Sequence, residues 1–317
     1  MKIAPLIHSR TFEVDFNSKF AVRPDDFTDS DIEWAREKIL PSTQDLNILN
    51  DVRFVVASKG GKCFAGIACM LDLFAEKFLS ADERADAENF FCDNRGRYIK
   101  LFLGFVIKDA SSKKIPDVTP SDLWQMFKEY LAPEWNRKAP ETVLAPYRDV
   151  REKNFVSSTP KPAQIFQGVE LYEMNPIVNK KLFDEYLARA LKQNLAFCTN
   201  LDRAQPIEDK IYHAVTTTAD IISRLRETQR QLDAESAQKK NQPEFQRSQQ
   251  SASARIDTSP LYAGKEIVTF AECLDRLNAV VDNLILVDEL NRHFEPKPFE
   301  YEDFFGKKFV CEVTKIG

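Results

Sequence analysis

The hydrophobic positions in the first third of this chain gather in three runs, and their pattern predicts the centre of a sheet. Two of the runs, over residues 53–57 and 62–71, flank Gly60 and Gly61, and paired glycines supply the positive φ angles that a tight hairpin turn requires. The third run, over residues 98–107, is continuously apolar, which is typical of a strand buried on both faces. We therefore predict three neighbouring strands in one sheet.

Two glycines inside these runs indicate a special backbone arrangement. Gly66 and Gly104 each lie within a predicted strand. Glycine is unfavourable inside a strand, so it usually marks a bulge or the close approach of another group to the backbone. We expect one of these arrangements at both positions.

Hydroxyl and acidic residues three positions apart predict the starts of helices in the first half. Such a capping box satisfies two backbone N–H groups at a helix N-terminus. It predicts one helix over about residues 30–40, a second near residues 82–90 and a third from about residue 122. The pairs are Ser30 with Glu33, Ser80 with Glu83, and Thr119 with Asp122. Before them, alternation over residues 11–23 predicts a strand or a short hairpin.

A proline-rich stretch predicts a division of the chain into two domains. Residues 133–162 contain five prolines, at positions 133, 140, 146, 160 and 162. Proline restrains φ and removes a backbone donor, so this stretch favours an ordered connector over a regular element. We place the boundary near residue 160, which gives an α+β domain over residues 1–160 and a helical domain over residues 161–317.

Long apolar stripes predict the helical domain. A strand over residues 165–174 precedes a helix over about 175–197. Pro206, followed by acidic residues, favours the start of a long helix that reaches about residue 232. The apolar seam of this helix has heptad spacing. The seam consists of Ile211, Val215, Thr218, Ile222, Leu225, Gln229 and Leu232.

The end of the chain completes this domain. Residues 233–260 are rich in Gln, Ser and charge, which predicts a mobile linker because little apolar area is available to offset the entropy of ordering. A capping box at Thr269 and Glu272 predicts a helix to about residue 291. A strand over residues 308–316 is expected to pair with the strand over 165–174.

The predicted fold class is therefore α+β. We expect an N-terminal, mainly antiparallel sheet with flanking helices. A C-terminal helical domain with a long helix pair and a small strand pair is expected to follow.

Composition narrows the function classes. The formal net charge of −5 argues against a constitutive nucleic-acid binder, because such a protein needs a basic face. Six cysteines without a C-x-x-C pair give no structural zinc motif, and reduced thiols are typical of the cytoplasm. The N-terminal apolar stretch is too short for a signal peptide, and no apolar run approaches the roughly 18 to 20 residues that span a bilayer. The expected location is cytoplasmic, away from the membrane.

No complete catalytic or cofactor motif is present in the sequence. A phosphate-binding loop at Gly61-Lys62 would need a glycine at position 56 and a hydroxyl residue at position 63, but these are Val56 and Cys63. The G-x-S-x-G nucleophile motif does not occur. The sequence therefore predicts no cofactor, no metal site and no assignable catalytic residue.

Part of the chain resembles the GNAT acetyltransferases. The resemblance depends on Ala21-Val-Arg-Pro24, on the capped helix from Ser30, and on the hairpin over residues 54–71 with its Ala65-Gly-Ile-Ala68, and it covers roughly residues 20–130. It implies an acyl-CoA site in which a glycine-rich turn at a helix N-terminus holds the pyrophosphate. The corresponding segment, residues 108–121, contains no glycine, so the resemblance implies a degenerate CoA loop.

Five charged residues form a candidate binding site. Asp93, Arg95 and Arg97 lie in a predicted turn at the mouth of the central sheet, and Arg148 and Arg151 follow in the proline-rich connector. Guanidinium groups bind carboxylates and phosphates bidentately, so convergence of these residues would provide a site for an anion or an acidic partner. The alternative is a solvated turn with ordinary surface ion pairs.

Together these features favour a non-enzymatic cytoplasmic interaction or regulatory protein. A heptad-like seam beside a mobile linker is an arrangement that a partner can order or a protease can cut. We expect a protein partner to bind through the helical domain or the linker, within a multi-protein system such as a bacterial defence or stress operon. Two alternatives stay open: a GNAT-like acyltransferase, and a nucleic-acid-binding accessory protein whose arginines share one face.

Overall fold

A computed structural model describes residues 1–14, 20–46, 51–108, 114–155, 157 and 160–241, together with three short strands nearer the C-terminus. The chain divides into two compact units, Met1–Gln238 and Lys239–Gly317. The first unit holds a large sheet and the helices that pack on it, and the second holds the three short strands.

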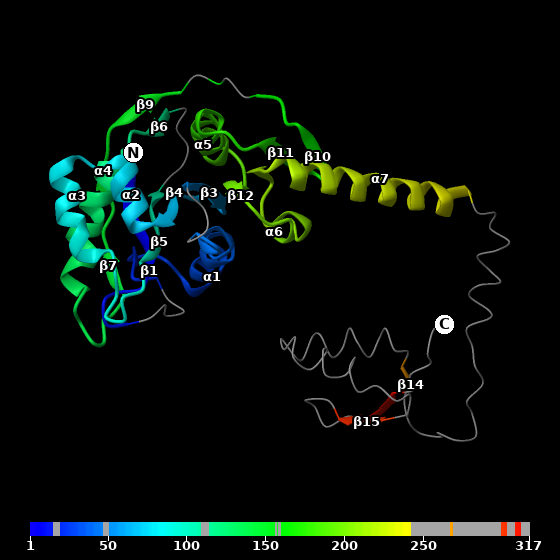
Figure 1. The fold of residues 1–317 in the computed structure, drawn as a ribbon, viewed down its shortest axis with the longest axis horizontal. Helices are drawn as coiled ribbons and strands as arrows, with labels where there is room; N and C mark the ends of the chain where they lie inside the picture. Colours follow the sequence, from blue (N-terminus) through cyan, green and yellow to red (C-terminus); the bar gives the residue numbers. More distant parts are fainter. Residues whose placement is uncertain are drawn as a thin grey trace. The chain divides into compact units, whose positions relative to one another are not determined.

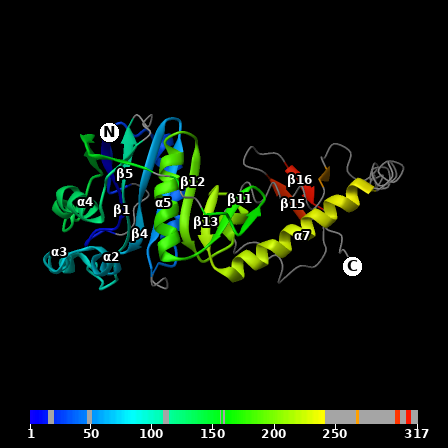
Figure 2. The ribbon, with the colours of Figure 1, turned by 90° about the horizontal axis from the view of Figure 1, so that it is seen from above.

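Within the described residues, eleven strands form one mixed sheet in the first unit (Figures 1 and 2). The strand order is β10-β11-β13-β12-β3-β4-β5-β1-β2-β7, and β8 pairs with β1. A separate pair is formed by β6 (Lys114–Pro116) and β9 (Glu152–Asn154). The strands of the large sheet are β1 (Lys2–Ser9), β2 (Val22–Pro24), β3 (Arg53–Lys59), β4 (Lys62–Met70), β5 (Lys100–Lys108), β7 (Val143–Ala145), β8 (Arg148–Asp149), β10 (Gln164–Phe166), β11 (Val169–Glu173), β12 (Leu195–Leu201) and β13 (Ala214–Thr217).

The central strands agree with the sequence-based prediction. β3, β4 and β5 are antiparallel neighbours, and φ is 60° at Gly60 and 83° at Gly61 in the turn between β3 and β4. Gly66 lies directly opposite Gly104 in the ladder of β4 and β5. A Cβ atom added to either glycine would lie 2.6 Å from a ring atom of Phe102, so the two glycines make room for this ring.

Strand β12 joins this antiparallel part of the sheet to a parallel part. It runs antiparallel to β3 and parallel to β13, which is itself parallel to β11. The boundary that the sequence predicts near residue 160 therefore falls inside the first unit, since later strands extend the same sheet. The described part of the proline-rich stretch contains the end of a short 3-10 helix and the short strands β7, β8 and β9, so it interrupts regular structure without ending the unit.

Helices cover both faces of this sheet and create two hydrophobic cores. α2, α4 and α5 contribute to one core, whereas α1, α6 and the first turns of α7 contribute to the other. Every residue of β12 is buried, as expected for a strand with cover on both faces. The helices are α1 (Asp29–Ile39), α2 (Leu71–Phe78), α3 (Ala81–Ala87), α4 (Pro120–Met126), α5 (Pro176–Ala190), α6 (Gln205–Glu208) and α7 (Ala219–Asn241), with short η1 (Pro41–Thr43), η2 (Glu88–Phe90), π-helical η3 (Phe127–Leu131) and η4 (Ala132–Glu134).

The N-terminal elements are partly shifted from their predicted positions. The boxes at Ser80 and Thr119 open α3 and α4 as predicted. α1 begins one residue early because Thr28 and Asp31, and not Ser30, form its capping box. The first strand is β1, which precedes the predicted strand over residues 11–23; of that range, residues 15–19 lie outside the described part.

The elements after the connector differ more from the prediction. α5 ends at Ala190, and Leu195, which lies within the helix predicted over about residues 175–197, begins β12. The long helix predicted from Pro206 is divided into α6, β13 and α7. Val215 of the heptad seam is a buried strand residue between β11 and β12. Pairing with two neighbouring strands outweighs the helical periodicity there.

In the second unit the structure describes β14 (Ile267–Val268), β15 (Phe299–Glu302) and β16 (Lys308–Cys311). β16 is parallel to β14 and antiparallel to β15. Its predicted pairing with the strand over 165–174 is wrong, since the partners of β11 are β10 and β13. The helix predicted to residue 291 and the linker beyond residue 241 lie outside the described residues, whereas residues 233–241 belong to α7.

Among the described helices, none combines the length and the apolar composition that crossing a membrane requires.

Candidate functional site

The turn that contains Asp93 supplies most of the hydrogen bonds to this carboxylate. Oδ1 of Asp93 accepts the backbone N–H groups of Arg95 and Arg97, each at 2.9 Å. Oδ2 accepts Nε of Arg97 at 2.8 Å and Nη1 of Arg10 at 3.2 Å. Burial opposes ionisation of Asp93, but the hydrogen bonds from Arg97 and Arg95 outweigh it and lower the pKa of this carboxyl. The carboxylate is therefore an internal partner of the turn.

The structure places the other two predicted arginines elsewhere. Arg148 lies in β8 opposite Ile3, near the start of β1, and its Nη1 donates to Glu129 at 2.9 Å. Asp93 contacts Arg10, which follows the end of β1. Ile3 and Arg10 are about 23 Å apart along an extended strand at about 3.3 Å per residue. Near Arg148, the carbonyl group of Arg151 accepts the N–H of Asp117.

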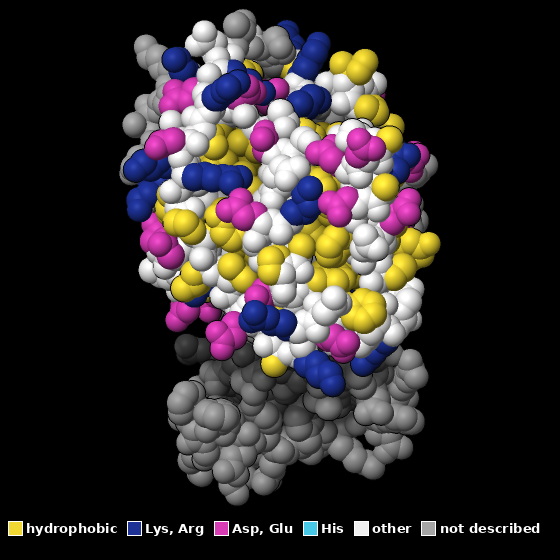
Figure 3. Space-filling model, turned by 90° about the vertical axis from the view of Figure 1, so that its left-hand side faces the viewer, with side chains coloured by type: hydrophobic (Ala, Val, Ile, Leu, Met, Phe, Trp, Pro, Cys, Tyr) yellow, Lys and Arg dark blue, Asp and Glu magenta, His cyan; other side chains and the backbone are white. Residues whose placement is uncertain are grey.

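The predicted anion site is thus split between the two ends of β1. On the face that bears α3 and α4, Lys and Arg side chains are interspersed with acidic and hydrophobic ones (Figure 3). The condition for the nucleic-acid hypothesis, four arginines on one patch, is not met by this arrangement.

The segments that carry the GNAT resemblance are also arranged differently from a CoA site. β2 pairs with β1 and β7, and the three strands β4, β5 and β1 separate it from β3 in the sheet. α4 has only seven residues, and the hydroxyl of Thr119 already accepts the N–H of Asp122 in its first turn. A pyrophosphate would have to displace this cap.

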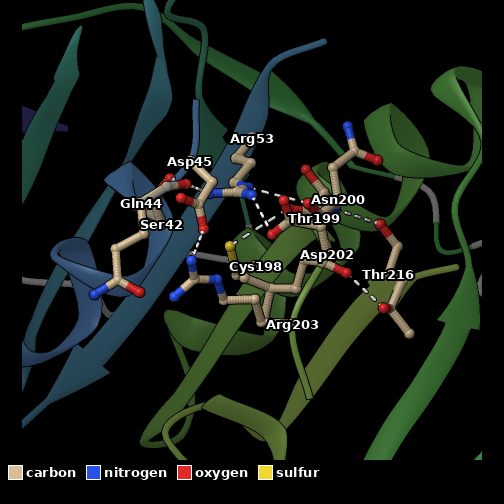
Figure 4. Close-up of polar contacts among 12 residues, drawn as sticks. Ser42, Gln44, Asp45, Arg53, Cys198, Thr199, Asn200, Asp202, Arg203 and Thr216 are labelled. Atoms are coloured by element: carbon tan, nitrogen blue, oxygen red, sulfur yellow. Dashed lines mark hydrogen bonds and ion pairs between the residues drawn. The ribbon is translucent and has the colours of Figure 1, made fainter. Parts of the chain in front are cut away.

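A buried polar network lies where β3 begins and β12 ends. Arg53 is fully buried, and its guanidinium donates to three backbone carbonyl groups and one carboxylate (Figure 4). Nε donates to Asn200 and Nη1 to Ser42, each at 3.0 Å; Nη1 also reaches the carbonyl group of Gln44, and Nη2 donates to Oδ1 of Asp202 at 2.7 Å. One side chain thereby ties the segment before β3 to the end of β12.

Asn200 is the second centre of this network. Its φ is 54°, in the left-handed region that asparagine tolerates better than most residues, and the pairing of β12 with β13 shifts register beside it. Nδ2 donates to the carbonyl group of Val52 at 2.8 Å, and Oδ1 accepts Nδ2 of Asn179 at 2.7 Å. The irregular end of β12 is therefore held from both sides.

The network also reaches the start of α7. The N–H of Asn200 donates to Oγ1 of Thr216 at 2.8 Å, and Thr217 donates to the carbonyl group of Leu201. Oγ1 of Thr218 accepts the N–H of Ile221 at 3.3 Å, which caps α7. We call Arg53, Asn179, Asn200, Asp202 and Thr216 the polar junction, because together they fix the root of this helix.

The chemistry available at the polar junction is that of a structural support. Open α/β sheets usually bind ligands outside the carboxyl ends of their parallel strands, but here the Arg53 guanidinium fills this position. Acidic side chains at its rim contact cations: Asp51 lies 3.2 Å from Lys77, and Asp45 pairs with Arg203. Burial raises the pKa of the nearby Cys198 thiol to about 12, which keeps it protonated.

Sequence reasoning missed this site. Arg53 was taken as the first residue of an apolar run, although an arginine at the start of a buried strand indicates a charge that needs partners. Its acceptors are mainly carbonyl groups, which every residue carries, so only the fold reveals them. Among the described residues, no group of three or more His, Cys, Asp or Glu side chains is placed to hold a metal ion.

The fold and the polar junction define a mixed-sheet protein with both helices and strands, whose strand-end position is occupied by its own side chains. Comparisons with protein-family models, with curated proteins and with solved structures found no match to this chain.

Proposed function

We propose that this chain is a non-enzymatic, cytoplasmic interaction protein in which the first unit anchors α7 and α7 presents a binding surface to a protein partner. The observation that carries the proposal is the exposure of the second half of α7. The helix has 23 residues, a length of about 35 Å at 1.5 Å per residue. Ile222 and Leu225 are buried, whereas the described side chains from Arg230 onward are exposed.

The first half of α7 is attached to the sheet by more than apolar contacts. Nε of Arg226 donates to Oε1 of Gln164, and Oε1 of Gln229 accepts the N–H of Gln167 at 3.1 Å. Both partners belong to the hairpin of β10 and β11 or its turn. The root of the helix is therefore held by this hairpin and by the polar junction.

Its second half extends past β10 and β11 (Figure 1). An isolated helical stretch is marginal in water, and pairs such as Gln229–Asp233, at 2.9 Å, each add only about 0.2 to 0.5 kcal/mol. A helix that is polar on all sides is one of the forms in which a chain crosses solvent between domains. Leu232, 37% exposed, continues the stripe of Ile222 and Leu225 and is the apolar contact we assign to the partner.

A multi-protein setting suits such a protein. We place it in a bacterial defence or stress system, where a chain with an anchored helix and a second unit links other components. The acyltransferase alternative has no specific observation in its favour, and a shift of the melting temperature by acetyl-CoA would restore it.

The experiment compares two matched variants of the full chain in its native host. Leu232→Asp places a charge on the apolar stripe of α7, and Ala234→Asp places the same charge on the opposite, exposed side. Tagged wild type and variants are purified after mild cross-linking, and the companions are identified by mass spectrometry.

We expect a defined companion with the wild type and with Ala234→Asp, and at least about a tenfold loss with Leu232→Asp, as burial of a charge at a contact residue should produce. Equal melting temperatures of the two variants serve as the folding control. A wild type without any specific companion, or equal recovery with both variants, would contradict the proposal.

A further inference from the structure

A cavity of about 90 Å³ lies between the sheet and the helices α4 and α5, on the face opposite α1. Its walls are predominantly hydrophobic, and they come from β3, β4, β5 and both helices. The main wall residues are Phe54, Ile67, Phe105, Leu123, Phe183 and Leu187. An apolar cavity of about 150 Å³ binds benzene, so this smaller one has room for an apolar body of about four carbon atoms.

Charged side chains stand at one side of this cavity. Lys153, Lys180 and Asp184 line it together with the apolar residues, which gives two cations to one anion. The side chains of Lys153 and Lys180 are 38% and 54% exposed, so they mark the side that faces solvent. The cavity thus combines an apolar interior with a mouth that carries two lysine ammonium groups.

The two lysines are only loosely paired. Nζ of Lys180 lies 3.7 Å from Asp184, and Nζ of Lys153 lies 3.8 Å from the same carboxylate and 3.9 Å from Asp117. Charge-assisted hydrogen bonds are usually about 2.7 to 2.9 Å long, so these ammonium groups have room to donate to another anion.

Lys180 is also held in position over the apolar wall. Its Nζ lies 5.0 Å from the ring centre of Phe183 and 5.7 Å from that of Phe54. These distances suit cation–π contacts, which orient the ammonium group along the wall of the cavity. An anion at the mouth would therefore meet a positioned cation.

We propose that this cavity binds a small monocarboxylic acid, with its apolar body among Phe54, Phe105 and Leu187 and its carboxylate between Lys153 and Lys180. The volume limits the body to a short chain of about four carbon atoms. The two ammonium groups, whose ion pairs are long, favour the acid over a neutral molecule of the same shape.

The ionisation of Lys180 agrees with this assignment. Burial lowers the pKa of its ammonium group, the Asp184 carboxylate opposes the shift, and Lys153 adds to it. A bound carboxylate would compensate the lost hydration of Lys180 and the repulsion between the two lysines.

The test uses two probes of the same shape and different charge, pentanoate and pentanamide, titrated into the full chain by calorimetry. We expect saturable binding of pentanoate in the millimolar range, and binding of pentanamide weaker by about tenfold or more. Lys180→Met keeps the apolar stem and removes the charge, so it should weaken pentanoate binding by about tenfold and leave pentanamide binding unchanged.

Two further variants separate the cavity from general effects. Lys181→Met removes an exposed charge one residue away and should change pentanoate binding by less than about twofold. Val118→Trp places a large ring in the cavity from a half-buried loop position and should abolish binding of both probes.

Four results would overturn the assignment. These are no heat with pentanoate, equal affinities for pentanoate and pentanamide, equal effects of Lys180→Met and Lys181→Met, and undiminished binding by a folded Val118→Trp variant. These outcomes do not depend on whether a partner protein is purified with the wild-type chain from its host. The acid-binding proposal and the interaction proposal can therefore be refuted independently.

Discussion

At the scale of single residues, Arg53 shows how a charge is stabilised inside an otherwise apolar fold. Its guanidinium is a planar group with five N–H donors. Its four acceptors are three backbone carbonyl groups and the carboxylate of Asp202. A lysine at this position could not make the same set of hydrogen bonds, because its ammonium group is a compact point charge. The cost of burying Arg53 is offset only while all these partners are in place.

Replacement of Arg53 by methionine is therefore predicted to destabilise the first unit strongly. The change leaves buried carbonyl groups of Ser42 and Asn200 without a donor, at a cost of about 3 kcal/mol or more. Chemical denaturation of the full chain measures the loss. Arg203→Ala, which removes the 55% exposed arginine paired with Asp45, is the control and should cost less than about 1 kcal/mol. Similar losses in both variants would show that the polar junction does not hold the fold.

A second residue-scale prediction concerns His8, which is buried in β1 beside Phe20. Burial, followed by the charges of Arg36 and Lys100, lowers the pKa of His8 to about 4. The unfolded chain, with an ordinary pKa near 6.5, binds the proton first as pH falls. Stability is therefore full above about pH 6.5 and decreases between pH 6.5 and pH 4, by about 3 kcal/mol in total.

The measurement compares the free energy of unfolding at about pH 7 and about pH 4.5 in the wild type and in His8→Gln. The variant should lose less stability on acidification, because it has no group to protonate at this position. His213→Gln is the comparison: burial also lowers the pKa of this more exposed imidazole, so its replacement should remove a smaller part of the loss on acidification. An identical pH dependence in the wild type and in His8→Gln would refute the assignment.

At the scale of elements, residues adjacent in sequence determined two helix starts and one hairpin turn. Contacts between residues distant in sequence determined how the other elements formed and paired. The hairpin at Gly60 and Gly61 and the caps at Ser80 and Thr119 were predictable, because the groups that form them are adjacent in sequence. Residues 211–217 followed a helical spacing but form part of a loop and β13. An apolar position every third or fourth residue is also satisfied by a short strand buried on both faces, so periodicity does not separate the two there.

α7 illustrates the same point from the other direction. Its seam of Ile222, Leu225 and Leu232 was recognised in the sequence, and the first two residues are buried as predicted. Leu232 has the same spacing and hydrophobicity but is exposed. Whether a stripe residue packs or remains available to a partner depends on where the neighbouring body ends, which the stripe itself does not encode.

At the scale of the whole molecule, the central finding is a sheet that crosses the expected domain boundary. β12 covers the side of β3 that would otherwise be an edge, and its residues lie in both hydrophobic cores. Edge strands with unpaired backbone groups are prone to aggregate, so the first 160 residues need the strands that follow.

Truncation tests this directly. A chain of residues 1–160 is predicted to lack a cooperative thermal transition and to aggregate, because it loses β12 and the helix α5 that covers β3. A chain of residues 1–238, which corresponds to the first compact unit, should melt cooperatively. Circular dichroism melting of the two chains is the measurement. A cooperative transition of the shorter chain would restore the boundary near residue 160.

The amino-acid sequence by itself determined the class of elements, the central three strands, two helix caps and the missing catalytic motifs, because these depend on neighbouring residues or on composition. The tertiary structure alone decided that β12 joins the two parts of the sheet, and that Arg53 and Asn200 meet at its end. It also separated Asp93 from Arg148 along β1 and left a cavity beside Lys180. Each of these depends on residues distant in sequence, and a one-dimensional pattern carries no information about which distant backbone groups become neighbours.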